Sequence, residues 1–244
     1  MSHKKFLRAL ETGEERIANK VNDVWVVNTE AKKKILEIFR SSAVVSMEGD
    51  FLDKEALQPQ KFKIENKIRV VPGGTSIRAG VHIGKNVVIM PPSYINIGAY
   101  VDDDTMIDSH VLVGSCAQIG KRIHLSAGVQ IGGVLEPIGN QPVIIEDDCF
   151  IGANAILVEG ILIREKAIIA PSVTLSASIP IYDLVNKKIY KGEVPSNAVV
   201  VPGTRAIKNN SWAAEEGLQL GCAIIVKYRD NKTRASVTLE DLLR

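Results

Sequence analysis

An aliphatic residue recurs every six positions through the middle of the chain. Its first eleven members are Val71, Ile77, Ile83, Ile89, Ile95, Val101, Ile107, Val113, Ile119, Leu125 and Ile131. Four residues after each of the first ten stands a second small or β-branched side chain, as Val111 follows Ile107. The pattern breaks over residues 132–142 and resumes at Ile145 in a new phase. A helix spaces apolar residues three and four apart, so this alternation of four and two predicts short strands joined by corners.

In such a chain the aliphatic residue of each hexad and the residue four positions later both point into a narrow prism. Each face of this prism is one parallel sheet. Three hexads form one coil, so residues 68–205 are expected to form roughly six coils. At ~4.8 Å per stacked strand, the prism would be about 30 Å long. The pattern resembles the left-handed parallel β-helix. Its handedness is implied by that resemblance alone, because ordinary crossovers are right-handed.

The segments at the two ends are predicted to cap the prism, because an open end exposes unpaired backbone groups. Residues 1–67 are expected to form a small helical N-terminal cap. Its expected elements are helices over 3–20 and 29–40, with an N-cap at Thr29, and a short strand over 24–27. Residues 206–244 are expected to form a C-terminal strand-turn-helix cap. Its expected elements are a strand over 221–228, a turn over 229–232 and a helical turn over 238–241.

The composition agrees with a mainly β fold, since the 244 residues include 29 Ile and 26 Val. The net charge of +2 gives no reason to expect nucleic acid or an anionic membrane as a partner. No apolar stretch is long enough to span a bilayer, and the first residues carry no apolar signal core. Cys116, Cys149 and Cys222 stand far apart without a C-x-x-C pair. We therefore expect no disulfide framework and no structural zinc, and a cytoplasmic location is the simplest.

Several motifs are more specific than a generic hexad. They are Met-Ile-Asp-Ser at 106–109, Val-Gly-Ser-Cys-Ala-Gln-Ile-Gly at 113–120, Gly-Gly-Val-Leu-Glu-Pro at 132–137 and Cys-Ala-Ile-Ile-Val-Lys at 222–227. Together they resemble the tetrahydrodipicolinate N-succinyltransferases, over about nine tenths of the chain. That resemblance implies a CoA-dependent N-acyltransferase of diaminopimelate and lysine biosynthesis. Its co-substrate would be succinyl-CoA and its acceptor the amine of tetrahydrodipicolinate (2-amino-6-oxopimelate), a small dicarboxylate.

The same resemblance implies two site residues. Asp108 matches the catalytic aspartate of the family, which would bind the substrate amine and help to deprotonate it. Because Asp108 follows the inward Ile107, its side chain is expected to face out of the prism. Arg69 matches the substrate-binding arginine, and its planar fork suits a carboxylate. The acidic runs at 102–104 and 146–148 are expected to be structural corner residues.

Two departures from the family pattern leave alternatives open. Ile156 stands where the resemblance implies a glutamate, so acetyl-CoA is possible as the donor and a non-catalytic scaffold is the rival class. His110 replaces a tryptophan and is a possible additional base. His124 is either another base or an interface histidine. No metal site is expected, because His82, His110 and His124 fall on different faces.

Residues 132–142 form an excursion from the coil, of the length that usually makes a lid or a partner contact. Within it Glu136 is a further possible base, and Gly133 would let a ligand approach the backbone closely. Lys191 and Arg205 are candidates to bind the phosphates of the acyl-CoA. A prism with three flat, partly apolar faces hides one face best against copies of itself. We therefore expect a homotrimer, with Asp108 facing loop or cap residues of the next copy.

Overall fold

In the computed structural model, which describes residues 2–229, the chain visits three parallel sheets in rotation, and we name each sheet by its first strand. The β5 sheet begins with β5 (Arg69–Val70), β8 (Val88–Ile89), β11 (Met106–Ile107), β14 (His124–Leu125), β17 (Phe150–Ile151), β20 (Ile168–Ile169) and β25 (Ala198–Ala206). The β6 sheet consists of β6 (Ser76–Ile77), β9 (Tyr94–Ile95), β12 (Leu112–Val113), β15 (Gln130–Ile131), β18 (Ile156–Leu157) and β21 (Thr174–Leu175). The β7 sheet consists of β7 (His82–Ile83), β10 (Tyr100–Val101), β13 (Gln118–Ile119), β16 (Ile144–Ile145), β19 (Leu162–Ile163) and β24 (Glu193–Val194).

Strands that lie next to each other in a sheet come from successive coils. Tyr100 of β10, for example, pairs in parallel with Gln118 of β13. The six strands in each of the β6 and β7 sheets match the number of coils that the hexads predict. The hexad residues from Ile89 to Ile131 are buried, whereas Val71 at the start of the coil is only half-buried because no further coil lies beyond it. A mainly β chain with this pairing fits a parallel β-helix.

Between the sheets the chain turns at three corners, which we name by the sheets they join. Most corners place one residue at a positive φ, in the left-handed region. At the β7–β5 corner these residues are Asn86, Asp104, Arg122, Asp148, Lys166 and Asn197. At the β5–β6 corner they are His110, Gly128, Asn154 and Ser172. Gly, Asn and Asp tolerate this conformation best, which explains why they recur at the corners.

The N-terminal segment mixes helices with hairpins. Its elements are α1 (His3–Thr12), β1 (Ala18–Val21), β2 (Val24–Val27), α2 (Thr29–Ser41), β3 (Val44–Met47), β4 (Phe51–Lys54), η1 (Glu55–Leu57) and η2 (Ile64–Asn66). The predicted helix over 3–20 is wrong beyond Thr12, because Gly13 adopts a φ of 76° and donates its N–H back to Leu10. The second predicted helix is confirmed. Its N-cap is Asn28, whose side chain accepts the N–H of Ala31, rather than Thr29.

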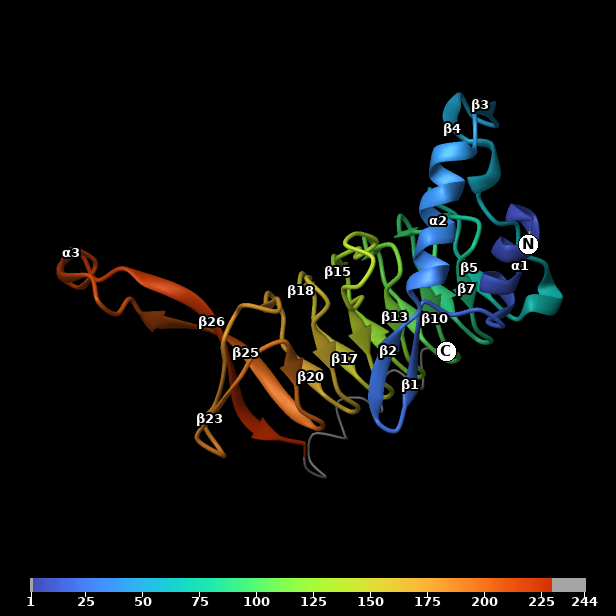
Figure 1. Ribbon diagram of the computed structural model, residues 1–244. Coiled ribbons are helices and arrows are strands. Elements are labelled where there is room, and N and C mark those ends of the chain that lie inside the picture. Colours follow the sequence, from blue (N-terminus) through green and yellow to red (C-terminus); the bar gives the residue numbers. More distant parts are fainter. Residues whose placement is uncertain (1, 230–244) are drawn as a thin grey trace.

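The β1–β2 hairpin lies along one side of the coil, over the β7 sheet (Figure 1). Trp25 Nε1 donates to Glu146 Oε1 at 2.9 Å, and the Arg16 guanidinium carbon lies 3.8 Å from the centroid of the Tyr100 ring. Burial alone would raise the pKa of Glu146, but hydrogen bonds from Trp25 and Lys20 lower it. The hairpin therefore covers the outward side of this sheet with satisfied polar contacts.

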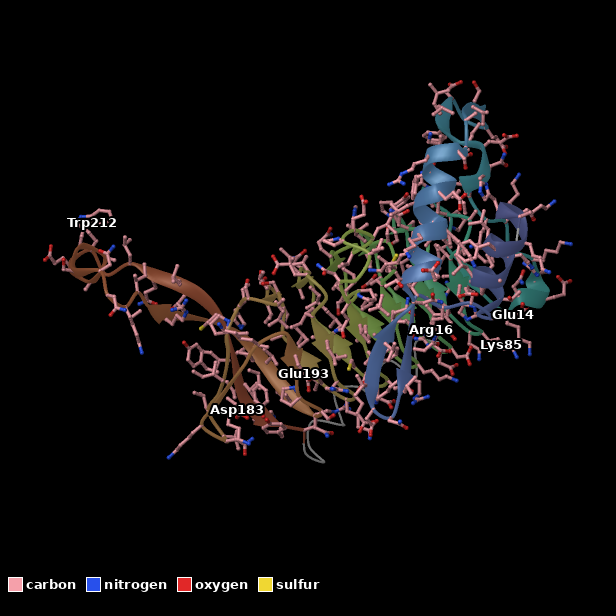
Figure 2. All side chains as sticks on the ribbon, viewed as in Figure 1. Glu14, Arg16, Lys85, Asp183, Glu193 and Trp212 are labelled. Carbon is pink, nitrogen blue, oxygen red and sulfur yellow. The ribbon has the colours of Figure 1, made fainter. Side chains whose placement is uncertain are left out.

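At the other end of the coil a two-stranded ribbon extends away from it (Figure 1). The ribbon is formed by β25 and β26 (Gln219–Tyr228), which pair antiparallel, with α3 (Ser211–Glu215) between them. The strand predicted over 221–228 is confirmed, and it joins the β5 sheet together with β22 (Ile181–Asp183) and β23 (Lys188–Tyr190). Trp212 lies at the tip of the ribbon, at the opposite end of the molecule from Arg16 (Figure 2). The turn predicted over 229–232, apart from residue 229, and the helical turn predicted over 238–241 lie outside the described residues.

Candidate active site

Asp108 lies at the β5–β6 corner, directly after β11. Its backbone N–H donates to Leu125 O of the next coil at 2.9 Å, which fixes the position of the corner. Its carboxylate Oδ1 accepts the N–H of Ser109 at 2.7 Å, and within residues 2–229 the carboxylate forms no ion pair. The side chain is half-buried on the outside of the coil, as the hexad count predicts. One carboxylate oxygen is therefore left to accept a hydrogen bond from a ligand.

Arg69 lies on the same sheet as the strand that precedes Asp108. It pairs with Val88 of β8, which pairs in turn with Met106 of β11. Two strand spacings separate Arg69 from Met106, or about 10 Å. The Arg69 side chain is exposed, and it forms no ion pair in the part of the chain that the structure describes. A dicarboxylate amine of several carbons is long enough to reach from one of these two groups to the other.

Two histidines lie close to Asp108 along the chain or across the sheet. His110 is exposed at the same corner, with a φ of 61°, and its backbone N–H donates to Pro92 O at 2.7 Å. His124 stands beside Met106 on the outward row of the β5 sheet, and its ring stacks on Phe150 with a centroid separation of 5.1 Å. His110 is thus positioned by the corner geometry, and His124 by ring stacking.

Glu136 and Gly133 belong to the loop that leaves the coil between β15 and β16, at the β6–β7 corner. A single chain therefore keeps Glu136 on a different corner from Asp108, and the Glu136 side chain is exposed. A Cβ added to Gly133 would lie 2.8 Å from Ser115 N. The close approach at Gly133 is that of the chain's own backbone, because the loop packs on the corner of the preceding coil.

Lys191 and Arg205 lie at the ribbon end of the molecule. Lys191 is exposed just after β23, whereas Arg205 is half-buried in β25, and its Nε has no hydrogen-bond partner among residues 2–229. In the sheet order, four strand spacings separate β25 from β11, or about 19 Å, and β23 lies three strands beyond β25. An extended cofactor-sized molecule would be needed to reach from Asp108 to these cations.

The three cysteines are reduced and buried. Burial raises the pKa of the Cys116 thiol to about 12 and also raises the pKa of Cys149, whose Sγ lies 3.1 Å from Arg164 O inside the coil. Thiols in this state are poor nucleophiles. Within residues 2–229 no group of three His, Cys, Asp or Glu side chains is arranged to hold a metal ion. In the same residues no helix has both the length and the apolar character needed to cross a membrane.

Lys32 is a buried charged residue that neither the hexad pattern nor the motifs single out. Lys32 on α2 is fully buried, and its Nζ donates to Asn140 O at 2.6 Å, so it joins the N-terminal helix to the loop at the β6–β7 corner. The sequence does hold a signal, because Lys32 stands three residues before the buried Ile35 and six before the buried Ile38, within the apolar stripe of its helix.

Comparisons with known proteins give the class. The family model described as "Hexapeptide repeat of succinyl-transferase" matches residues 142–177, which span β16 to β21. A solved structure from Campylobacter jejuni, described as a 2,3,4,5-tetrahydropyridine-2-carboxylate N-succinyltransferase, aligns with a TM-score of 0.50 at 16% identity. That alignment covers 96% of this chain and 63% of the other, and it supports the fold. Both matches place the chain in the class of proteins with a hexapeptide-repeat fold.

Curated relatives give the family. Three proteins named 2,3,4,5-tetrahydropyridine-2,6-dicarboxylate N-succinyltransferase, from Sodalis glossinidius, Rhodopseudomonas palustris and Acinetobacter baylyi, are 44%, 46% and 46% identical to this chain. Each alignment covers 98% of this chain and 86% or 87% of the relative. The chain belongs to the 2,3,4,5-tetrahydropyridine-2,6-dicarboxylate N-succinyltransferase family. The resemblance inferred from the motifs is thus confirmed.

Proposed function

We propose that this chain transfers a succinyl group from succinyl-CoA to the amine of tetrahydrodipicolinate, in its open 2-amino-6-oxopimelate form. The observation that carries the proposal is the family membership, which rests on similarity along almost the whole chain. The reaction belongs to diaminopimelate and lysine biosynthesis in the cytoplasm. The second carboxylate oxygen of Asp108, with Arg69 on the same sheet, supplies the groups that an amine and a carboxylate of this acceptor require.

The transfer runs directly between the two bound substrates. The amine nitrogen attacks the thioester carbonyl, the new C–N bond forms, and the C–S bond then breaks. Asp108 accepts the proton that the amine loses, and the CoA thiolate leaves and takes up a proton. Arg69 holds a carboxylate of the acceptor in place, and backbone N–H groups of the coil polarise the carbonyl. An acyl-enzyme is disfavoured, because the cysteine thiols are buried.

The remaining candidates have supporting roles in this proposal. Lys191 and Arg205 bind phosphates of the acyl-CoA, and the exposed backbone beside Gly133 borders the acyl group. His110 or Glu136 serves as an additional base if Asp108 alone does not remove the proton from the substrate amine. No metal takes part in the reaction. Arg205 suits its role because a half-buried guanidinium whose Nε has no hydrogen-bond partner within residues 2–229 favours an anionic ligand.

The active assembly is a homotrimer of left-handed coils. The outward row of the β5 sheet is mostly apolar and half-buried in one chain, and this is the kind of flat face that a second copy covers. After Arg69 at its first strand, the row continues with Val88, Met106, His124, Phe150, Ile168 and Val199. In a trimer, Asp108 at the corner of one copy faces the loop of residues 132–142 in the next. Light scattering should give three times the chain mass of 26.6 kDa, and a monomeric mass at micromolar concentration would contradict this assembly.

One residue, Ile156, supports acetyl-CoA as an alternative acyl donor. Ile156 is 38% exposed on the outward side of the β6 sheet, where the family resemblance implies a glutamate, so acetyl-CoA is the alternative. The test is a thiol-release assay with each acyl-CoA and an aminopimelate acceptor. We expect succinyl-CoA to be preferred. A preference for acetyl-CoA above about tenfold, or ~1.4 kcal/mol in transition-state binding, would reverse the order. Release with neither donor would support a non-catalytic scaffold.

A further inference from the structure

The loop at the β6–β7 corner is tied to the coil at both of its ends. Near its start, Val134 N donates to Ser115 O of the preceding coil at 3.1 Å. Near its end, Gln141 Nε2 donates to Gly160 O of the following coil at 2.9 Å. Glu136 lies between these ties and is exposed. The loop is thus a strap with two fixed ends rather than a freely hinged segment.

A third tie reaches the loop from outside the coil. Lys32 of α2 is 0% exposed, and its ammonium donates to Asn140 O at 2.6 Å. Leu135, on the other side of the loop tip, packs against the cluster that contains Ile35 and Cys116. The helix therefore holds both arms of the loop, one by an apolar contact and the other by a charge-assisted hydrogen bond.

The identity of residue 32 is not explained by packing. A lysine is almost never fully buried without a partner, and among residues 2–229 the hydrogen-bond partner of Lys32 is a neutral carbonyl, that of Asn140. Burial lowers the pKa of Lys32, because the interior disfavours the charged form. An unbranched apolar side chain of similar length would fill the same space on the apolar stripe without that cost. What only the lysine provides is the hydrogen bond to the loop.

We propose that Lys32 is a positioning residue, which holds the loop of residues 132–142 in one place so that its tip forms a fixed wall of the acyl-transfer site. The proposal rests on the proposed function, since it takes the loop as part of that site. In this arrangement the loop is fixed to the N-terminal helix and does not act as a mobile lid. Glu136 then reaches the neighbouring copy from a constant position.

The experiment compares Lys32→Met with Lys33→Met in the full-length protein. Methionine keeps the length of residue 32 and removes the donor, whereas Lys33 lies on the same helix with its Nζ paired to Glu30 on the surface. Amide hydrogen exchange in residues 134–141 should become at least about tenfold faster in Lys32→Met, without a lower unfolding temperature. The kcat/KM for succinyl transfer should fall about tenfold, mainly through kcat. Lys33→Met should change neither quantity.

Each other outcome overturns part of the proposal. Unchanged exchange in Lys32→Met would show that Lys32 does not hold the loop. Faster exchange throughout α2 with a lower unfolding temperature would show a merely structural role. A looser loop with unchanged kinetics would remove the loop from the site and leave succinyl transfer standing. If the unmodified chain transfers no acyl group, the proposed function fails, and the exchange measurement still decides whether Lys32 fixes the loop.

Discussion

Asp102 and Asp108 occupy the same position at two different corners of the coil. Each follows a buried hexad residue, and each accepts the N–H of the next residue, at 2.8 Å for Asp102 and 2.7 Å for Asp108. Asp102, at the β7–β5 corner, also lies 3.9 Å from Lys121 Nζ of the next coil. At the β5–β6 corner the residue one coil beyond Asp108 is Ser126, and within residues 2–229 Asp108 has no cation as a partner.

The difference extends along both corners. At the β7–β5 corner, Lys121 also pairs with Asp103 at 3.4 Å, and Arg122 holds both oxygens of Asp148 at 2.7 Å and 2.9 Å. The hydrogen bond from Lys85 N lowers the pKa of Asp103, and the hydrogen bond from Arg122 lowers that of Asp148. These carboxylates are held by the coils above and below. Asp108 has the same local geometry, but within residues 2–229 no cation of a neighbouring coil pairs with it. One oxygen of its carboxylate therefore stays available to a substrate.

Both corners depend on the folded coil beneath them, and a charge placed in the core of the coil should unfold it. Ile119 is fully buried in β13, so Ile119→Asp forfeits about 1.5–3 kcal/mol of side-chain burial and adds several kcal/mol for an unpaired charge. Against a typical total of about 5–15 kcal/mol, we expect the chain to lose its fold. Circular dichroism measures the loss. The same change at the exposed Ile156 should leave the spectrum intact, and a folded Ile119→Asp would contradict the inward assignment.

The two aspartates themselves give the sharpest contrast in activity. Asp108→Asn keeps the size of the side chain but cannot accept the amine proton, so kcat should fall at least about 100-fold. Asp102→Asn removes the same charge at the other corner and should leave kcat within about twofold, since its carboxylate pairs with Lys121. Steady-state kinetics of both variants measure the difference. Near-normal turnover in Asp108→Asn would refute its role and direct attention to His110 or Glu136.

The ion pairs at the β7–β5 corner should contribute to the free energy of unfolding in a pH-dependent way. The pKa of Asp148 is lowered in the folded chain, so its pairing stabilises the fold above the unfolded pKa of about 3.9 and is lost as the pH falls through the folded value. Arg122→Gln should cost about 1 kcal/mol at pH 7, because the pair is bidentate but partly exposed. Urea unfolding at pH 7 and below pH 3 measures this cost. A cost that persists in acid would show that the effect is not the ion pair.

The smallest effect is expected at His110. Its φ of 61° is close to the φ of 58° of Asn154, at the same corner two coils on, so asparagine fits this conformation. His110→Asn should therefore leave kcat within about twofold and stability within about 0.5 kcal/mol. Kinetics over a range of pH, together with urea unfolding, check both expectations. A large loss of kcat with the fold intact would make His110 the base in place of Asp108.

The order of buried side chains was predictable because the hexad is a local rule. Inward side chains that follow each other at spacings of four and two residues place Ile107 and Val111 in the core and leave Asp108 outside, whatever the other residues are. The outward placement of Asp108 followed from that count. The N-terminal helix over 3–20 was wrong beyond Thr12 because a left-handed glycine and a hairpin, neither a matter of periodicity, end it there.

The tertiary structure alone decided which of these outward residues have partners. Lys121 meets Asp102 one coil away, and the loop of residues 132–142 shifts the register so that Arg122 meets Asp148 across twenty-six positions. Lys32 meets Asn140 from a separate helix. Such pairs depend on how coils stack and on where an inserted loop is placed, and neither is written in the local spacing. The sequence therefore determined which side chains face outward, and stacking determined which of them remain free to bind.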